Sequence, residues 1–176
     1  HFEARRQRQM CIRDSMNTLS KTDIYGYVSQ LCDSLERNYK EYRIRMHETN
    51  FTSFKSQNRT DLSDYAQEQL RNIENGTEKL MKFACYEGRK YFKVVQNDFR
   101  NGEYRDASVH AFINKETGEV FKPAGYNKPA RGVRYDLTNE THRNFLFQSK
   151  NVDWAGGYLY ISCLLYTSDA ADELRS

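Results

Sequence analysis

The spacing of apolar residues changes at Gly88, and this change restricts the chain to a fold that combines helices with an antiparallel sheet. Before Gly88, over residues 23–46, apolar residues recur every three or four positions, as on one face of a helix. After Gly88 the spacing becomes two, as in a half-buried strand. We therefore expect an α+β fold, with N-terminal helices packed on a small antiparallel β-meander and a short helix near the C-terminus.

Two of the three helices predicted in the first half have recognisable ends. The first covers residues 23–46 and leads into a polar loop over residues 49–60. The second is capped by Asp61 or Ser63 and stops at Asn75-Gly76, a pair that favours a helix end.

A hairpin is the clearest local signal in the second half. Gly118 lies between two apolar runs and can take the left-handed conformation that closes a turn with a bulge. The other predicted elements are a short helix over 77–86, strands over 91–96, 108–113, 119–122 and 158–161, a long turn over 97–106 and a short helix over 138–149.

Both ends of the chain resemble translated sequencing-library DNA. Residues 5–15, RRQRQMCIRDS, resemble one reading frame of the adapter used in transposase-based library preparation. Residues 163–173, CLLYTSDAADE, resemble its reverse complement, and the flanking residues are compatible with one shared sample index. The alternative is a basic arm at one end and an apolar strand with an acidic tail at the other.

The resemblance implies that residues 1–15 and 163–176 are adapter-derived and are set aside before the fold is considered. We then expect residues 16–162 to form a single domain, helical over 16–87 and β-rich over 88–162. We also expect this domain to be truncated, because the insert runs directly into adapter at both ends.

Removing the ends changes the cysteine count but not the charge. The formal net charge stays at +3, while four cysteines become two, Cys32 and Cys85. These two lie far apart in sequence, which favours buried or inert thiols over a metal cluster. No apolar stretch approaches the roughly 20 residues of a membrane span, so no membrane partner is expected.

The most distinctive segment follows the hairpin and runs from Phe121 to Tyr135. It interleaves cations, which neutralise phosphates, with aromatic rings, which stack on unpaired bases. Its prolines and glycines restrict the backbone that presents them. We predict a contact surface for single-stranded DNA or RNA, formed by Lys122, Tyr126, Lys128, Arg131, Arg134 and Tyr135.

The alternative is a structural or protein-interaction module without nucleic-acid binding. In that hypothesis the same loop packs the short helix after Leu137 against the sheet.

No motif supports catalysis. The sequence has no HExxH, GxSxG or GxGxxG, and no histidine has a partner at metal-ligand spacing. The strand pattern places His110 on one face with Phe112, opposite Val109, Ala111 and Ile113. We predict no catalytic residue, no metal and no cofactor. An enzyme would require a pocket in which His110 or Cys85 meets a second polar group within hydrogen-bond reach.

Three motifs in the second half carry a further resemblance. They are VHAFI at residues 109–113, KETGEVFKPA at 115–124 and KPARGVRY at 128–135. Together they resemble a group of small uncharacterised proteins from tailed phages and viral metagenomes, over about residues 89–162.

The resemblance implies a phage source but transfers no catalytic residue. We therefore expect a non-catalytic phage accessory domain in the cytoplasm of an infected host cell. Its expected partner is single-stranded nucleic acid or another phage protein.

Overall fold

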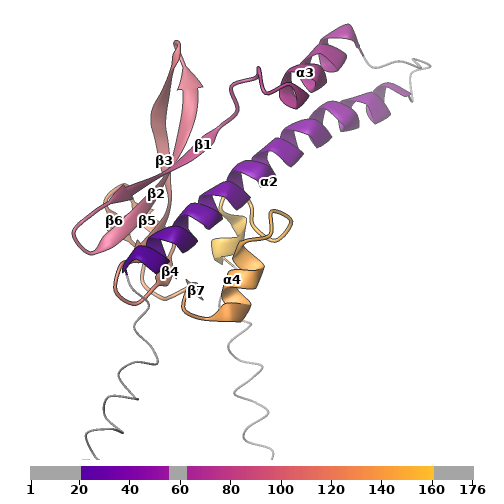
Figure 1. Cartoon of the computed structure of the whole chain (residues 1–176). Coiled ribbons are helices and arrows are strands. Elements are labelled where there is room, and N and C mark those ends of the chain that lie inside the picture. The colour runs from indigo at the N-terminus through magenta and orange to yellow at the C-terminus, as the bar shows by residue number, and fades with distance from the viewer. Residues whose placement is uncertain (1–20, 56–62, 161–176) are drawn as a thin grey trace, which may run out of the picture.

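The computed structural model describes residues 21–55 and 63–160 (Figure 1). The two segments predicted to be adapter-derived lie outside these residues, as do residues 56–62. The elements in chain order are α2 (Lys21–Lys55), α3 (Asp64–Glu74), β1 (Lys82–Glu87), β2 (Tyr91–Arg100), β3 (Glu103–Asn114), β4 (Glu119–Phe121), β5 (Pro123–Gly125), β6 (Lys128–Pro129), β7 (Tyr135–Asp136), α4 (Glu140–Leu146) and the 3-10 helix η1 (Gly157–Tyr160).

One antiparallel sheet forms the centre of the fold. Its strands lie in the order β1-β2-β3-β4-β7, and β5 pairs with β6 in a separate hairpin. The long helix α2 runs diagonally past the sheet, and α4 lies beside the first half of α2 (Figure 1). This arrangement confirms the expected α+β fold with a short helix near the C-terminus.

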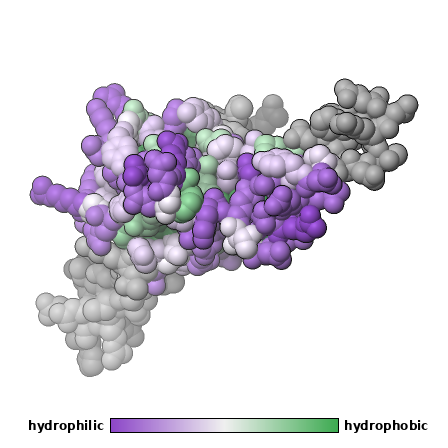
Figure 2. Space-filling model, turned by 90° about the horizontal axis from the view of Figure 1, so that it is seen from above, coloured by the Kyte–Doolittle hydropathy of each residue, from purple (hydrophilic) through white to green (hydrophobic). Residues whose placement is uncertain are grey.

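The core forms where α2 meets the sheet. One stripe of α2 is fully buried, and its residues are Ile24, Val28, Leu31 and Leu35. They belong to one apolar cluster with Phe92 and Ile113 of the sheet and with residues of α4 and η1. Burial of each such side chain contributes roughly 1.5–3 kcal/mol. Most of the surface in Figure 2 is hydrophilic, with apolar groups visible mainly in the middle of the body.

The second predicted helix is confirmed as α3. Ser63, one of the two expected caps, accepts a hydrogen bond from the backbone N–H of Ala66 at 3.3 Å. The predicted loop over 49–60 is wrong for residues 49–55, which continue α2. The polar composition that favoured a loop there did not stop the helix, because no glycine or proline lies between Thr49 and Lys55.

The predicted turn at Gly118 is confirmed. Its φ is +74°, and its N–H donates to the Asn114 carbonyl at 2.9 Å. The side chain of Asn114 also accepts from the N–H of Glu116 at 2.9 Å, which holds the turn from inside. The short helix α4 is also present, with Asn139 capping the N–H groups of Thr141 and His142.

The predicted helix over 77–86 is wrong. Residues 82–87 form β1, which pairs with β2 along its length. Phe83 points into the core, and its N–H donates to Glu36 of α2 at 2.9 Å. A short apolar run fits a helix or a strand, and only pairing with β2 decides between them.

Two further boundaries differ from the expectation. The long turn predicted over 97–106 is wrong, because β2 and β3 continue to a two-residue turn at Asn101-Gly102, both with positive φ. The strand predicted over 158–161 is wrong for residues 158–160, which belong to η1. Asp153 accepts the N–H groups of Ala155 and Gly157 and so forms the turn that starts η1.

A β-bulge in β3 changes the direction of the His110 side chain. Val94 pairs with Ala111 and Val95 with Val109, so His110 has no opposite residue on β2. The prediction that His110 shares a face with Phe112 is therefore wrong. His110 contacts the core ring of Phe83, with centroids 5.2 Å apart, because the extra residue breaks the alternation of the strand.

Candidate nucleic-acid interface

The predicted basic aromatic segment begins as a short hairpin on the sheet. Pro123 of β5 pairs with Pro129 of β6, and Tyr126 and Asn127 form its tip. The tip reaches β2, where Lys93 donates to the Asn127 side chain at 3.5 Å. Strand alternation directs Lys93 away from the α2 side of the sheet, which Phe92 faces. The hairpin therefore lies on the sheet face opposite α2.

Tyr126 is held in place at both its hydroxyl and its ring. Its hydroxyl donates to Oδ2 of Asp106 at 3.1 Å, and Nζ of Lys93 lies 4.2 Å from the ring centroid. The residue is still 48% exposed. The hydrogen bond to Asp106 raises the pKa of Tyr126, so the hydroxyl stays a donor. The ring is thus oriented in advance and open to solvent, as a base-stacking surface requires.

Asp106 connects the hairpin to two strands. Besides Tyr126, its carboxylate accepts from the hydroxyl of Tyr86 on β1 at 2.8 Å and from the amide of Asn97 on β2 at 3.3 Å. Three donors on one carboxylate offset its charge and restrict its rotation. Asp106 therefore acts as an anchor for the Tyr126 ring.

The six predicted contact residues occupy different environments. Lys128 and Arg131 are exposed, and so is Tyr126. Lys122 and Arg134 are partly buried, and Nζ of Lys122 lies 3.7 Å from the Tyr160 ring centroid. The exposed members form what we call the hairpin surface: Tyr126, Lys128 and Arg131.

Tyr135 lies in the core and not on this surface. It is only 7% exposed, its ring stacks on Phe145 of α4 with centroids 5.6 Å apart, and its hydroxyl donates to the Tyr158 carbonyl at 3.0 Å. Its ring is therefore not available to a nucleic-acid base. This part of the segment packs α4 against the sheet.

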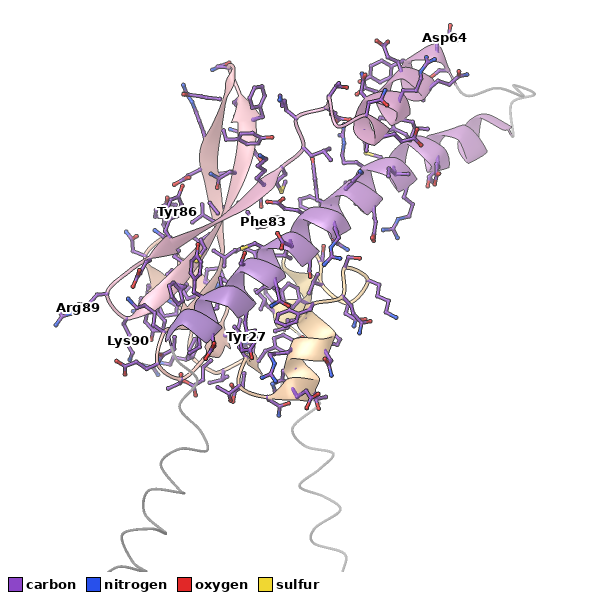
Figure 3. The ribbon with its side chains drawn as sticks, in the orientation of Figure 1. Tyr27, Asp64, Phe83, Tyr86, Arg89 and Lys90 are labelled. Carbon is purple, nitrogen blue, oxygen red and sulfur yellow. The ribbon has the colours of Figure 1, made fainter. Side chains whose placement is uncertain are left out.

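A groove of about 420 Å³ adjoins the hairpin surface, and the sequence did not predict it. Its aromatic and basic lining residues, with the amide at the hairpin tip, are Tyr86, Arg89, Lys90, Tyr91, Lys93, Phe112 and Asn127. Figure 3 shows Arg89 and Lys90 together on the turn between β1 and β2, with Tyr86 further along the same side. The run Arg89-Lys90-Tyr91 could have indicated the groove, had β1 been recognised as a strand.

The His110 side chain has a second polar group, the Tyr158 hydroxyl, within hydrogen-bond reach, but both side chains are buried. Its Nε2 lies 2.9 Å from the Tyr158 hydroxyl, and the two residues are 6% and 3% exposed. Burial lowers the pKa of His110 to about 4, against smaller opposing effects of Asp153 and the Trp154 backbone. Burial also raises the pKa of Tyr158 well above its usual value. Both groups are therefore neutral at pH 7.

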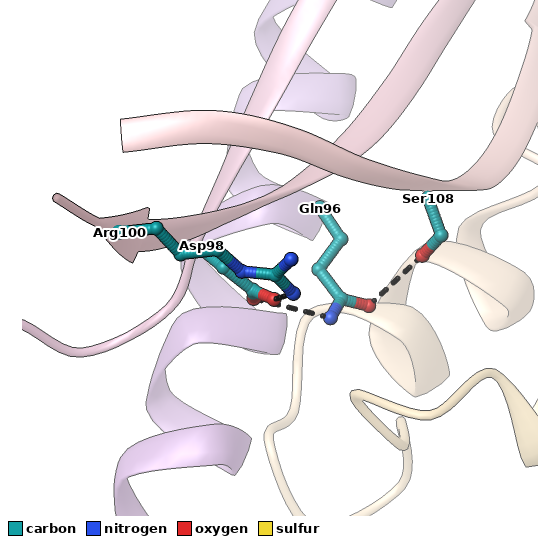
Figure 4. A network of polar contacts seen from close by, with 4 residues as sticks. All are labelled: Gln96, Asp98, Arg100 and Ser108. Atoms are coloured by element: carbon teal, nitrogen blue, oxygen red, sulfur yellow. Dashed lines mark hydrogen bonds and ion pairs between the residues drawn. The ribbon is translucent and has the colours of Figure 1, made fainter. Parts of the chain in front are cut away.

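A small cavity of about 150 Å³ lies beside His110 and is also lined by Gln96 and Ser108. A row of hydrogen-bonded side chains extends from this cavity, beginning at Ser108 of β3 and continuing along β2 (Figure 4). Ser108 donates to Gln96 at 3.2 Å, Gln96 donates to Asp98 at 3.4 Å, and Arg100 donates to Asp98 at 2.8 Å. Each carboxylate oxygen of Asp98 thus accepts one hydrogen bond.

The two described cysteines are free thiols. Burial raises the pKa of Cys85 to about 11 and that of Cys32 still further, so both stay protonated at pH 7. Within residues 21–55 and 63–160, no group of three or more His, Cys, Asp or Glu side chains could hold a metal ion. No helix in the same ranges is long and apolar enough to span a membrane.

The fold and the surface together define an α+β domain whose antiparallel sheet carries α2 on one face and a basic aromatic hairpin on the other. The chain belongs to the family of unknown function DUF7717, which matches residues 8–161. This match begins inside the first segment predicted to be adapter-derived and ends before the second. No curated protein and no solved structure matches the chain.

Proposed function

We propose that this domain binds single-stranded DNA or RNA, without catalysis, as an accessory protein of a phage. The observation that carries the proposal is the Tyr126 ring, which is fixed by Asp106 and Lys93 yet open to solvent. Lys128 and Arg131, both exposed on the same segment, supply cations for the phosphates. The phage source and the cytoplasm of the host cell follow only from the resemblance of residues 89–162.

Fluorescence polarisation with a labelled ten-residue oligothymidine and its RNA counterpart, at two salt concentrations, tests this proposal. We expect binding that weakens as salt rises, because phosphate contacts release counterions. The K128A/R131A double variant should bind about tenfold more weakly at low salt. A matched control is R45A/K150A, which removes the same charge from a separate pocket beside Trp154.

The four arginines at positions 5, 6, 8 and 13 could bind nucleic acid through their charge alone. The measurement is therefore repeated with all four changed to Gln in the full chain. Binding that disappears in this variant, or that is equally weak in K128A/R131A and R45A/K150A, would overturn the proposal.

The alternative function is a structural or protein-interaction module. Its support is Tyr135, which stacks on Phe145 of α4 and bonds to the Tyr158 backbone. In this alternative the whole segment serves packing, and the full chain shows no affinity for either oligonucleotide at low salt.

A further inference from the structure

We infer that the groove between the β1–β2 turn and the hairpin tip is a nucleotide subsite, which holds one unpaired base with its phosphate. This inference rests on the proposed function and extends it to residues outside the predicted segment. The groove, of about 420 Å³, is within the range of pockets that hold small ligands.

The aromatic part of the groove is packed against neighbouring rings. The ring of Tyr91 packs edge-on against Phe112 and Phe121, with centroids 6.1 and 5.9 Å apart. Nζ of Lys90 lies 5.5 Å from the centroid of the same ring. Tyr91 is only partly buried, so a base can approach a ring whose orientation is already fixed.

The charge of the groove favours an anion. Arg89, Lys90 and Lys93 line it, and the one acidic lining residue is Glu87. Glu87 forms an ion pair with Lys115, whose side chain is nearly buried and also donates to the Gly88 carbonyl at 3.0 Å. The Glu87 charge is therefore offset from within the protein. The positive charges of Arg89, Lys90 and Lys93 therefore remain to attract a phosphate.

The groove and the hairpin surface are continuous. Lys93 lines the groove and also lies over the Tyr126 ring, and Asn127 of the hairpin tip forms part of the groove wall. Tyr86 lines the groove too, and its hydroxyl shares Asp106 with that of Tyr126. A strand with one nucleotide in the groove can therefore stack its neighbour on Tyr126, which a base-paired duplex cannot do.

The R89A/K90A double variant of the full chain tests the subsite with the same ten-residue oligothymidine. Both side chains are exposed on a turn, so the variant should melt at the wild-type temperature. We expect about tenfold weaker binding at low salt. The slope of the logarithm of the binding constant against the logarithm of the salt concentration should fall in magnitude by about 1.4. This value corresponds to two lost phosphate contacts at about 0.7 each for a single strand. A duplex of the same length should bind more weakly than the single strand.

The outcomes separate the subsite from the proposed function. If the wild-type chain binds neither oligonucleotide, the proposed function fails, and the subsite with it. If K128A/R131A weakens binding while R89A/K90A matches the R45A/K150A control in affinity and slope, only the subsite is overturned. Equal affinity of the wild type for single strand and duplex would also overturn it.

Discussion

Nε2 of His110 lies 2.9 Å from the Tyr158 hydroxyl, inside the core that joins the sheet to η1. The bulge in β3 brings the imidazole to this position. The hydrogen bond joins η1 to the sheet, and the tautomer of the neutral imidazole sets which of the two groups donates. Burial disfavours the charged imidazole, so the pair is stable with His110 neutral.

The first prediction concerns acid stability. The pKa of His110 is about 4 in the folded protein and about 6.5 when unfolded, so the unfolded state binds the additional proton between these values. The stability that comes from keeping His110 neutral is fully present above pH 6.5 and is lost as the pH falls towards 4. The loss is on the order of 3 kcal/mol. Urea unfolding at pH 7.0, 5.5 and 4.5 measures it.

The control for the acid prediction is H110Q, which keeps a polar side chain but cannot take up the proton. It should be less stable at pH 7 and should lose less free energy than the wild type between pH 7.0 and 4.5. An identical pH dependence in the two proteins would contradict the assignment to His110.

The second prediction concerns the partner hydroxyl. Y158F leaves Nε2 of His110 buried without its hydrogen-bond partner and should lower the free energy of unfolding by about 1–3 kcal/mol. Y160F removes a hydroxyl from a residue that is 68% exposed and should change it by less than about 0.5 kcal/mol. Thermal melts of both variants give the comparison, and equal melting temperatures would exclude a role for the Tyr158 hydroxyl.

The third prediction concerns the turn between β3 and β4. Gly118 has φ of +74°, and a Cβ there would lie 3.2 Å from Cγ2 of Thr138. G118A should therefore destabilise the fold by about 1–2 kcal/mol. Gly125 has no positive φ and no atom within 4 Å of an added Cβ, so G125A is the matched control and should be nearly neutral. Urea midpoints measure both, and G118A as stable as G125A would contradict the strain.

The fourth prediction separates the ring of Tyr126 from its hydroxyl. Y126L removes the stacking surface and should weaken oligothymidine binding about tenfold. Y126F keeps the ring but loses the bond to Asp106, and should weaken binding by only about twofold to threefold. Polarisation titrations at one low salt concentration rank the three proteins. If Y126F binds as weakly as Y126L, the hydroxyl and not the ring makes the contact.

Local signals predicted part of the fold correctly. The stripe from Ile24 to Leu35 fixed the helical face that meets the sheet, because its spacing is a property of one helix alone. Gly118 and the cap at Ser63 were also recognisable, since each acts on backbone groups within a few residues. The strand β1 was missed because Phe83 takes its place only through contacts with β2 and α2.

The candidate site also combines features that local sequence predicts with features that depend on distant contacts. The sequence by itself determined the helical and β-rich halves and the composition of the segment from Phe121 to Tyr135, because residue type and spacing are local properties. Only the tertiary structure decided that Tyr126 faces solvent while Tyr135 lies in the core, and that Arg89 and Lys90 stand beside the hairpin tip. Strand pairing and packing against α4 set these positions, and both depend on residues that are distant in the chain.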